Sequence, residues 1–300
     1  MTDVDLPVIS ITVSTIQGWP DIERNVRSFE AAAARVGGEL IVTDGSGRPA
    51  PRRDEIASAT IWHLEPGASV YEMRSLAYQM SRAPVIAVTE DHCLVPPDWA
   101  ASLLSALAAE PDAAAVGGSV ENGSRDTILD WASYFVVQAT LIPPIASGRV
   151  DRIAGAGNVA YRRHALRDID DFDGLGTMES LHQRQLRRSG SILLADDSIR
   201  VHHDQHLDFA SATKLHYHAG RTYAGFLRHR MDRLAWFRFI ALPVVPIARL
   251  LRAAKLASKR GHGRTISRAW PMMLWLLYAQ AAGHLLGFVV GPGDSPRRVQ

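Results

Sequence analysis

Short apolar runs alternate with helical patterns along the first 200 residues of the chain. The runs are rich in β-branched residues, which is typical of strands buried on both faces of a parallel sheet. Between the runs, apolar residues recur three and four positions apart, which is typical of amphipathic helices. The pattern predicts strands at 8–13, 39–44, 61–64 and 84–88, and helices at 21–34, 70–80 and 97–109.

Strands and helices that alternate in this order predict an α/β fold with a doubly wound, mostly parallel sheet. A second block begins near Ala113 and contains one more strand at 115–120 and an aromatic stretch at 131–135. A flexible loop at 142–148 then leads to the glycine-rich stretch 154–158. We therefore expect this part of the chain to form one large α/β domain.

The pattern changes near the C-terminus. The stretch 236–251 is apolar but is interrupted by Pro243 and Pro246, and Trp270–Val290 is a run of about 21 residues without a formal charge. That length is what a membrane-spanning helix needs. A buried or surface-docked helical hairpin would give the same pattern. The two prolines favour a bent element in the membrane interface for the first stretch, and they leave open whether the second stretch spans the membrane or lies on it.

Charge divides the chain in a similar place, although the net charge is only +2. Residues 1–220 hold 19 Lys and Arg against 29 Asp and Glu, whereas residues 221–268 hold 12 Lys and Arg against Asp232 alone. A basic segment of this kind favours an anionic membrane surface, and positive flanks favour its cytoplasmic face. We expect residues 1–230 to form the α/β domain and residues 231–300 to form a helical, membrane-associated extension.

Composition excludes several classes of protein. A hydrophobic content of 47% and a charged content of 21% are typical of a folded chain and not of a disordered one. Cys93 is the only cysteine, which excludes a disulfide framework and a cysteine-based metal site. The acidic start at residues 1–5 lacks the features of a signal peptide. We expect the main domain to lie in a reducing cytoplasm and to have no nucleic-acid partner.

The strand at 84–88 ends in a cluster of acids and an imidazole, Thr89-Glu90-Asp91-His92, which is followed by the turn Pro96-Pro97. Open α/β sheets bind their ligands just outside the carboxyl ends of their strands. Side chains of these types are suited to holding a divalent metal against phosphate oxygens. An ordinary surface turn before an acidic helix start is the alternative interpretation.

Further motifs occur in order along the chain: Ser14-Thr15, Val42-Thr43-Asp44-Gly45-Ser46, Arg74, Gly155-Ala156-Gly157-Asn158, and Glu179 followed by Arg187-Arg188-Ser189-Gly190. Together with the acidic strand tip, they make residues 6–230 resemble the family-2 glycosyltransferases of the GT-A fold. These are inverting enzymes that use nucleotide-sugar donors. The resemblance implies transfer of a sugar, from a UDP-sugar by expectation, to a hydroxyl group. The expected membrane location favours a lipid-linked or polysaccharide acceptor.

The resemblance also implies residues that bind the donor. Ser14-Thr15 would contact the nucleotide, Asp44 would hydrogen-bond the base, and Arg74 would contact the diphosphate or order the acidic loop. The small residues at Gly157-Asn158 would let the backbone approach the donor sugar. A turn or helix cap is the alternative role for Asp44, and a surface ion pair is the alternative for Arg74.

The family's metal-binding Asp-x-Asp positions fall on Glu90 and His92, with Asp91 between them. A metal in that place bridges the two phosphates and neutralises charge on the leaving nucleoside diphosphate. Imidazole suits Mn²⁺ better than Mg²⁺, and either ion is a candidate. Either His92 is a ligand, or Asp91 is the ligand and His92 contacts phosphate. His203 or its neighbour His202 would join the metal or the diphosphate.

An inverting transfer is a single in-line displacement, so one carboxylate must take the proton of the acceptor hydroxyl. The resemblance assigns this role to Glu179, with Met178 in place of the family's other acid. The alternative is that Glu179 only stabilises a helix N-terminus.

Two other classes of function fit parts of the pattern. A catalytically silent binding or scaffold protein on the same fold would explain the departures from the family at Ser14, Ser75, His92 and Met178. A nucleotidyltransferase shares the metal at the strand tip, but its phosphate loop, rich in Gly and Lys, does not follow the first strand here. We expect a metal-dependent, inverting glycosyltransferase on the cytoplasmic face of the cell membrane.

Overall fold

The computed structural model describes four stretches of the chain, residues 6–49, 59–167, 179–228 and 243–299. The chain forms two compact units, one of Met1–Glu121 with Pro143–Asp204 and one of Asn122–Ile142 with Gln205–Gln300. Met178 and the expected domain boundary at 230 lie outside the described residues.

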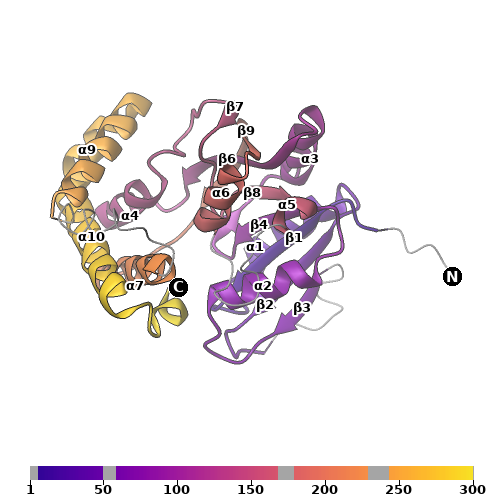
Figure 1. Cartoon of the computed structure of the whole chain (residues 1–300), viewed down its shortest axis with the longest axis horizontal. Helices are drawn as coiled ribbons and strands as arrows, with labels where there is room; N and C mark the ends of the chain where they lie inside the picture. Colours follow the sequence, from indigo (N-terminus) through magenta and orange to yellow (C-terminus); the bar gives the residue numbers. More distant parts are fainter. Residues whose placement is uncertain (1–5, 50–58, 168–178, 229–242, 300) are drawn as a thin grey trace. The chain divides into compact units, whose positions relative to one another are not determined.

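A mixed sheet forms the centre of the first unit (Figure 1). Its strands lie in the order β3 (Ala59–His63), β2 (Glu39–Asp44), β1 (Ser10–Thr15), β4 (Val85–Glu90), β8 (Val159–Arg162), β6 (Ala113–Asn122), β9 (Ile192–His203) and β5 (Cys93–Leu94), and β7 (Gly148–Val150) also pairs with β9. The first four strands are parallel. The pairs β4–β8, β6–β8, β5–β9 and β7–β9 are antiparallel.

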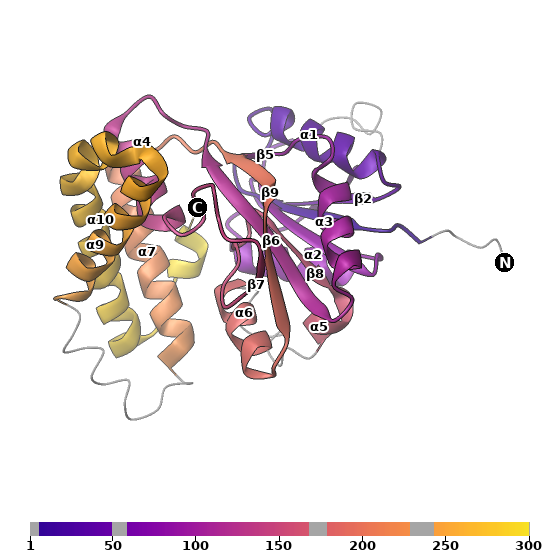
Figure 2. The same ribbon diagram turned by 90° about the horizontal axis from the view of Figure 1, so that it is seen from above.

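Helices lie on both sides of this sheet (Figure 2). They are α1 (Glu23–Ala34), α2 (Val70–Met80), α3 (Trp99–Ala109), α5 (Arg163–Arg167) and α6 (Glu179–Arg188). The chain moves from β1 to β2 through α1, but from β3 back past β1 to β4 through α2. Because such crossovers are right-handed, α1 and α2 lie on opposite faces. The predicted α/β class is therefore confirmed, with a parallel first half and an antiparallel second half.

Local sequence signals account for the accuracy of several boundaries. The strand β2 and the helix α2 have the predicted bounds. The helix begins with a capping box, in which the Ser69 hydroxyl accepts from the amide of Glu72 and the Glu72 carboxylate accepts from the amide of Ser69. The first strand was predicted at 8–13 but lies at Ser10–Thr15, so Ser14 and Thr15 belong to the strand instead of the loop after it.

Asn158 connects three parts of the first unit from within its core. Its amide nitrogen donates to the carbonyls of Ser119 on β6 and Ile199 on β9, at 2.8 and 2.9 Å. Its amide oxygen accepts from the indole of Trp99 on α3, at 2.8 Å. At Gly118 a Cβ atom would lie 1.7 Å from the Ile199 carbonyl oxygen, so β6 must carry glycine there. Asn158 is fully buried, and its hydrogen bonds add side-chain links between the neighbouring strands β6 and β9 and the helix α3.

The second unit is helical. It contains α4 (Ile128–Gln138), α7 (Phe209–Leu227), α9 (Val245–Ala257), a π-helical turn at Ser258–His262, α10 (Gly263–Val290) and a final 3₁₀ turn at Ser295–Arg298. Within the described residues, Val245–Val290 is the helical segment that is long and apolar enough to cross a membrane. Gly261, with φ of 89°, divides this segment into α9 and α10.

Glycines join α7 to α10 in the second unit. A Cβ atom at Gly283 would lie 1.9 Å from the Tyr217 carbonyl oxygen, and one at Gly287 would lie 2.3 Å from that of Arg221. Small residues spaced four apart let two helix backbones touch in this way. The charge-free run of the sequence is therefore part of a tightly packed helix pair.

We predict that Asn158→Ala destabilises the first unit by on the order of 3 kcal/mol, because three buried partners lose their hydrogen bond. Urea unfolding of the full chain, followed by circular dichroism, measures the change. The matched control is Asn25→Ala, which removes a single hydrogen bond to the Cys93 carbonyl and should cost about 1 kcal/mol. Equal losses in the two variants would show that Asn158 does not connect the core as described.

Candidate functional site

The carboxyl ends of the three central parallel strands meet at one edge of the sheet. In the strand register, Thr15 at the end of β1 lies opposite Asp44 at the end of β2. Along its other edge β1 pairs with β4, and there Ser14 lies opposite Glu90 at the end of β4. This is the edge at which open α/β sheets bind ligands, and the topology alone brings these polar residues together there.

Asp91 follows β4 directly and is held from both sides. The Thr15 hydroxyl donates to its Oδ2 at 2.7 Å, and the amides of Gln17 and Gly18 donate to the same hydroxyl oxygen at 3.1 Å. The other carboxylate oxygen, Oδ1, lies 3.0 Å from Nδ1 of His92. Thr15 therefore fixes Asp91, and Asp91 orients the imidazole of His92.

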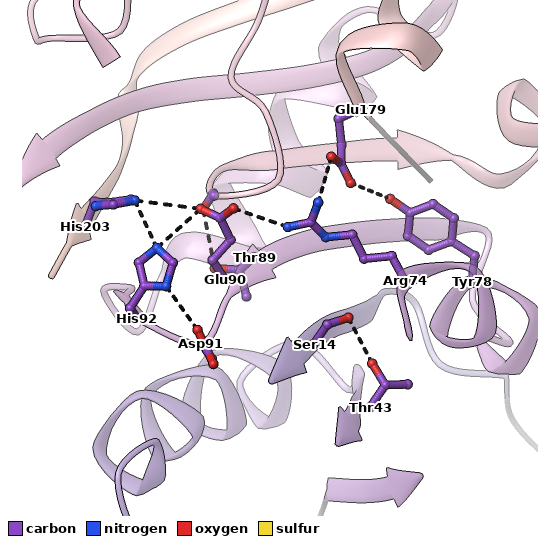
Figure 3. Close-up of polar contacts among 11 residues, drawn as sticks. Ser14, Thr43, Arg74, Tyr78, Thr89, Glu90, Asp91, His92, Glu179 and His203 are labelled. Carbon is purple, nitrogen blue, oxygen red and sulfur yellow. Dashed lines mark hydrogen bonds and ion pairs between the residues drawn. The ribbon is translucent and has the colours of Figure 1, made fainter. Parts of the chain in front are cut away.

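His203 approaches His92 from the end of β9, which pairs with the short strand β5. The two Nε2 atoms are 2.9 Å apart, and the rings meet edge to face with centroids 4.4 Å apart (Figure 3). The adjacent His202 points the other way, because successive strand residues face opposite sides, and lies 3.5 Å from Glu121. The structure thus brings His203, and not His202, to the acidic strand tip.

Glu90, His92 and His203 form a cluster that could hold a metal ion. Their ligand atoms all lie within 4.8 Å of one another, and Oε2 of Glu90 is 3.6 and 3.8 Å from Nε2 of the two histidines. When Nδ1 of His92 donates to Asp91, its Nε2 presents a lone pair toward the centre of the cluster. A histidine that binds a metal through one ring nitrogen commonly donates a hydrogen bond from the other to a carboxylate, which fixes its orientation. The donor set therefore fits a divalent cation.

This grouping differs from the ligand set that the sequence suggested. Glu90 and His92 stood at the two expected metal-binding positions, and Glu90 is the carboxylate that faces both imidazoles. Asp91 was expected as a ligand, but both of its oxygens are engaged by Thr15 and His92. The assignment of ligands stays a prediction, in which Glu90 is the stronger candidate and Asp91 supports His92.

Burial and charge set the protonation of the cluster. Burial raises the pKa of Glu90, but His92, Arg74 and His203 outweigh it and hold that pKa below its ordinary value. Burial lowers the pKa of His92, but the hydrogen bond to Asp91 and the charge of Glu90 raise it above its ordinary value. Burial and the neighbouring His92 lower the pKa of His203 to about 4. His203 is therefore neutral near pH 7, as a metal ligand must be.

Arg74 links this cluster to Glu179 (Figure 3). From α2, its guanidinium donates to Oε2 of Glu179 at 3.0 Å and to Oε1 of Glu90 at 3.2 Å. The two neighbouring carboxylates outweigh the cost of burial and raise the pKa of Arg74. One buried, permanently charged group thus bridges acids that are 89 residues apart in the chain.

Glu179 opens α6 and is 4% exposed. The Tyr78 hydroxyl donates to its Oε1 at 3.4 Å, opposite the oxygen that Arg74 contacts. Burial raises the pKa of Glu179 and outweighs the positive charge of Arg74. A carboxyl with a raised pKa beside a ligand site is a candidate acid or base.

The sequence did not single out Tyr78. It lies four residues after Arg74, so both side chains leave the same face of α2. That spacing is the signal which could have identified it.

The other predicted donor-binding residues lie around the same edge. The Ser14 hydroxyl is 2.9 Å from that of Thr43. The buried Asp44 accepts from the amide of Ser46 at 2.8 Å through Oδ1, while its Oδ2 has no hydrogen bond among the described residues and lies 3.6 Å from Nδ1 of His63. A buried carboxylate oxygen without a hydrogen bond can accept one from a ligand.

Gly157 and Asn158 differ in what they offer. A Cβ atom at Gly157 would lie 3.3 Å from Oε2 of Glu90, so a larger residue would press on the cluster. Asn158, by contrast, uses its side chain within the core. Its expected contact with the donor stays a prediction, and what the structure shows is that it fixes the backbone beside Gly157.

No protein-family model matches this sequence, and no curated protein matches it either. Among solved structures, the mannosyltransferase PcManGT from Pyrobaculum calidifontis, in complex with GDP-Man and Mn²⁺, resembles the chain with a TM-score of 0.59. The two are 17% identical, and the match covers 94% of this chain and 88% of that one. TarS 1–349 from S. aureus matches with a TM-score of 0.50 and 11% identity, over 92% of this chain and 88% of that one. At these identities the likeness shows the fold, and the chain has a GT-A-type α/β fold.

Proposed function

We propose that this protein is a metal-dependent glycosyltransferase that moves a sugar from a nucleoside-diphosphate donor, a UDP-sugar, to a hydroxyl group with inversion. The observation that carries the proposal is the cluster of Glu90, His92 and His203 at the ligand-binding edge of a GT-A-type sheet. Arg74 connects this cluster to a buried carboxyl with a raised pKa, Glu179. The mannosyltransferase of similar fold was solved with a nucleotide sugar and Mn²⁺, which supports the same class of donor and cofactor.

Glu90, His92 and His203 would hold the divalent cation, Mn²⁺ or Mg²⁺, and Asp91 would orient His92. When bound, such an ion neutralises charge on the diphosphate and so stabilises the leaving group. Imidazole ligands favour Mn²⁺ of the two, because Mg²⁺ prefers oxygen.

Arg74 would add a permanent positive charge beside the same diphosphate. Its bonds to Glu90 and Glu179 fix the guanidinium, so the charge is in place before the donor arrives. Ser14 and Thr15 at the end of β1 would contact the nucleotide, and the free Oδ2 of Asp44 would accept from its base. Gly157, kept in place by Asn158, would leave room for the donor sugar.

Glu179 would act as the base. A carboxylate has about four lone-pair directions, so the hydrogen bonds from Arg74 and Tyr78 leave it able to accept a proton. It would take that proton from the acceptor hydroxyl as the oxygen attacks the anomeric carbon and the bond to the diphosphate breaks.

Residues 231–300 would attach the protein to the cytoplasmic face of the cell membrane. The length and composition of Val245–Val290 and the excess of cations at 221–268 support this location. In this scheme residues 1–230 carry the donor chemistry, and the acceptor is a lipid-linked sugar or a growing polysaccharide.

We predict that Mn²⁺ increases the affinity for UDP and that His203→Ala reduces this Mn²⁺-dependent gain by about 10-fold or more. Isothermal titration calorimetry with and without Mn²⁺ measures it. The matched control is His202→Ala, which removes the neighbouring imidazole that faces Glu121 and should leave the gain unchanged. Equal UDP affinity with and without Mn²⁺ would contradict the proposed metal site.

Glu179→Gln should lower turnover by about 100-fold or more while leaving UDP binding nearly unchanged, as expected for loss of a base. Release of UDP in the presence of donor and acceptor gives the rate. Glu110→Gln, which alters an exposed ion pair with Arg149, is the control and should keep full turnover. Donor binding without turnover in the unmodified protein would favour the silent binding protein over the enzyme.

Glu179→Gln should also remove a pH-dependent loss of stability. Because the pKa of Glu179 is raised in the folded protein, this group favours the fold while it is protonated. Its contribution is present below the pKa of the unfolded state and is lost as pH rises through the higher folded pKa. Thermal unfolding should therefore show the variant gaining stability relative to the unmodified protein as the pH rises above about 4. A relative loss over that range would show that the ionised form is the favoured one.

A further inference from the structure

The helix α10 has two contrasting faces. One face is buried in the second unit and includes Ala269, Met273, Leu276, Gly283 and Gly287. The opposite face is exposed along the whole helix, and we call it the α10 stripe. It consists of residues spaced three and four apart, Arg264, Arg268, Pro271, Trp275, Tyr278, Ala282, Leu285 and Val289.

The α10 stripe is apolar where a surface helix is ordinarily polar. Trp275 is 52% exposed, Leu285 is 47% exposed and Val289 is 56% exposed. A helix that packs one face on its own protein normally turns charged residues to water on the other. A row of large apolar side chains on that outer face marks a surface for an apolar partner.

The start of α9 extends this surface. The Tyr278 hydroxyl donates to the Pro243 carbonyl at 3.1 Å, which places the beginning of α9 beside the α10 stripe. Val244, Ile247 and Leu251 are exposed there, and Leu251 reaches 65%.

The charge of this region identifies the partner. Residues 243–290 contain seven Lys and Arg and no Asp or Glu. Arg264 and Arg268 continue the α10 stripe beyond its apolar part, and Arg252 and Lys255 are exposed on α9. Apolar side chains next to cations complement the acyl chains and headgroups of anionic lipid. Trp and Tyr are also the residues that concentrate at the membrane–water boundary.

The packing of α10 determines its orientation. Its glycines touch the α7 backbone at Tyr217 and Arg221, so the two helices are held together along their length (Figure 2). The helix α7 carries Lys214, His218 and Arg221, which are costly to place in hydrocarbon. A helix bound along its length to such a neighbour cannot cross a bilayer without taking those charges with it.

We propose that the α10 stripe, with the exposed start of α9, docks flat on an anionic bilayer. Trp275, Leu285 and Val289 enter the boundary between headgroups and acyl chains, and Arg264 and Arg268 contact lipid phosphates. The inference rests on the membrane location under the proposed function and deepens it, since it chooses a surface-bound helix over a spanning one. It does not depend on the chemistry at Glu90 or Glu179.

The test uses the full-length protein and vesicles of phosphatidylcholine, either pure or with about 30% phosphatidylglycerol. In a flotation assay the protein should bind the anionic vesicles, and Leu285→Gln combined with Val289→Gln should lower binding by about 10-fold or more. Val137→Gln is the matched control, because Val137 is an exposed apolar residue of α4 outside the stripe. Its binding should equal that of the unmodified protein.

Depth is measured by quenching of tryptophan fluorescence with brominated lipids. The difference in fluorescence between the unmodified protein and Trp275→Phe gives the emission of Trp275. Bromine near the headgroups should quench this emission more than bromine at the chain ends does. Stronger quenching at the chain ends would overturn the flat orientation. Failure of the folded protein to bind either vesicle would overturn the docking surface. Self-association in lipid-free buffer that the double variant abolishes would also overturn it, in favour of a second copy of the chain.

Calorimetry of UDP with Mn²⁺ on the same preparations separates this proposal from the function of the first unit. The double variant should bind UDP as the unmodified protein does. Loss of vesicle binding with normal UDP binding tests the stripe alone, whereas absence of UDP binding in a protein that still floats with vesicles would contradict only the proposed donor site.

Discussion

The candidate site depends on one buried arginine. Arg74 lies between Glu90 and Glu179. Among the described residues, it is the cation that hydrogen-bonds to both acids. Removing two carboxylates and a guanidinium from water is expensive, and their mutual attraction offsets this only when geometry and additional hydrogen bonds are good. Tyr78 supplies one such bond. The position of α6, which carries Glu179, is thus tied electrostatically to the tip of β4.

The sequence predicted the parts of this arrangement that follow from periodicity. The buried parallel strands and α2 could be located because their apolar spacing and caps are local signals. The short strands β5, β7 and β8 were missed, since two to four residues carry no periodicity, yet β5 is what brings His203 to His92. The sequence could propose acids and imidazoles at the strand tip, but not which oxygens would be engaged. That depends on Thr15, which reaches Asp91 only because β1 and β4 are neighbours.

The C-terminal helices show a different limit of sequence analysis. Hydropathy sums over all sides of a helix, so a charge-free run looks the same whether it spans a membrane or packs on a protein. The structure separates the two sides of α10, because Gly283 and Gly287 face α7 while Leu285 and Val289 face outward. The glycines that weaken a helix in solution are here the residues that let α7 approach. Conformation, and not mean composition, decides what the apolar run can contact.

Charge balance connects the candidate metal cluster with Glu179. Asp91 and Glu179 are buried acids, Glu90 is partly buried, and Arg74 is the permanent cation among them. Burial raises the pKa of Glu179, and Asp91 and Glu90 raise that of His92, so both groups tend to hold a proton that offsets the negative charge. A divalent cation between Glu90 and the imidazoles would supply that positive charge in place of protons, and ligand binding of this kind releases protons. Metal binding would then favour the ionised form of Glu179, so the same electrostatics that accept the cation would also prepare Glu179 for its proposed role as a base.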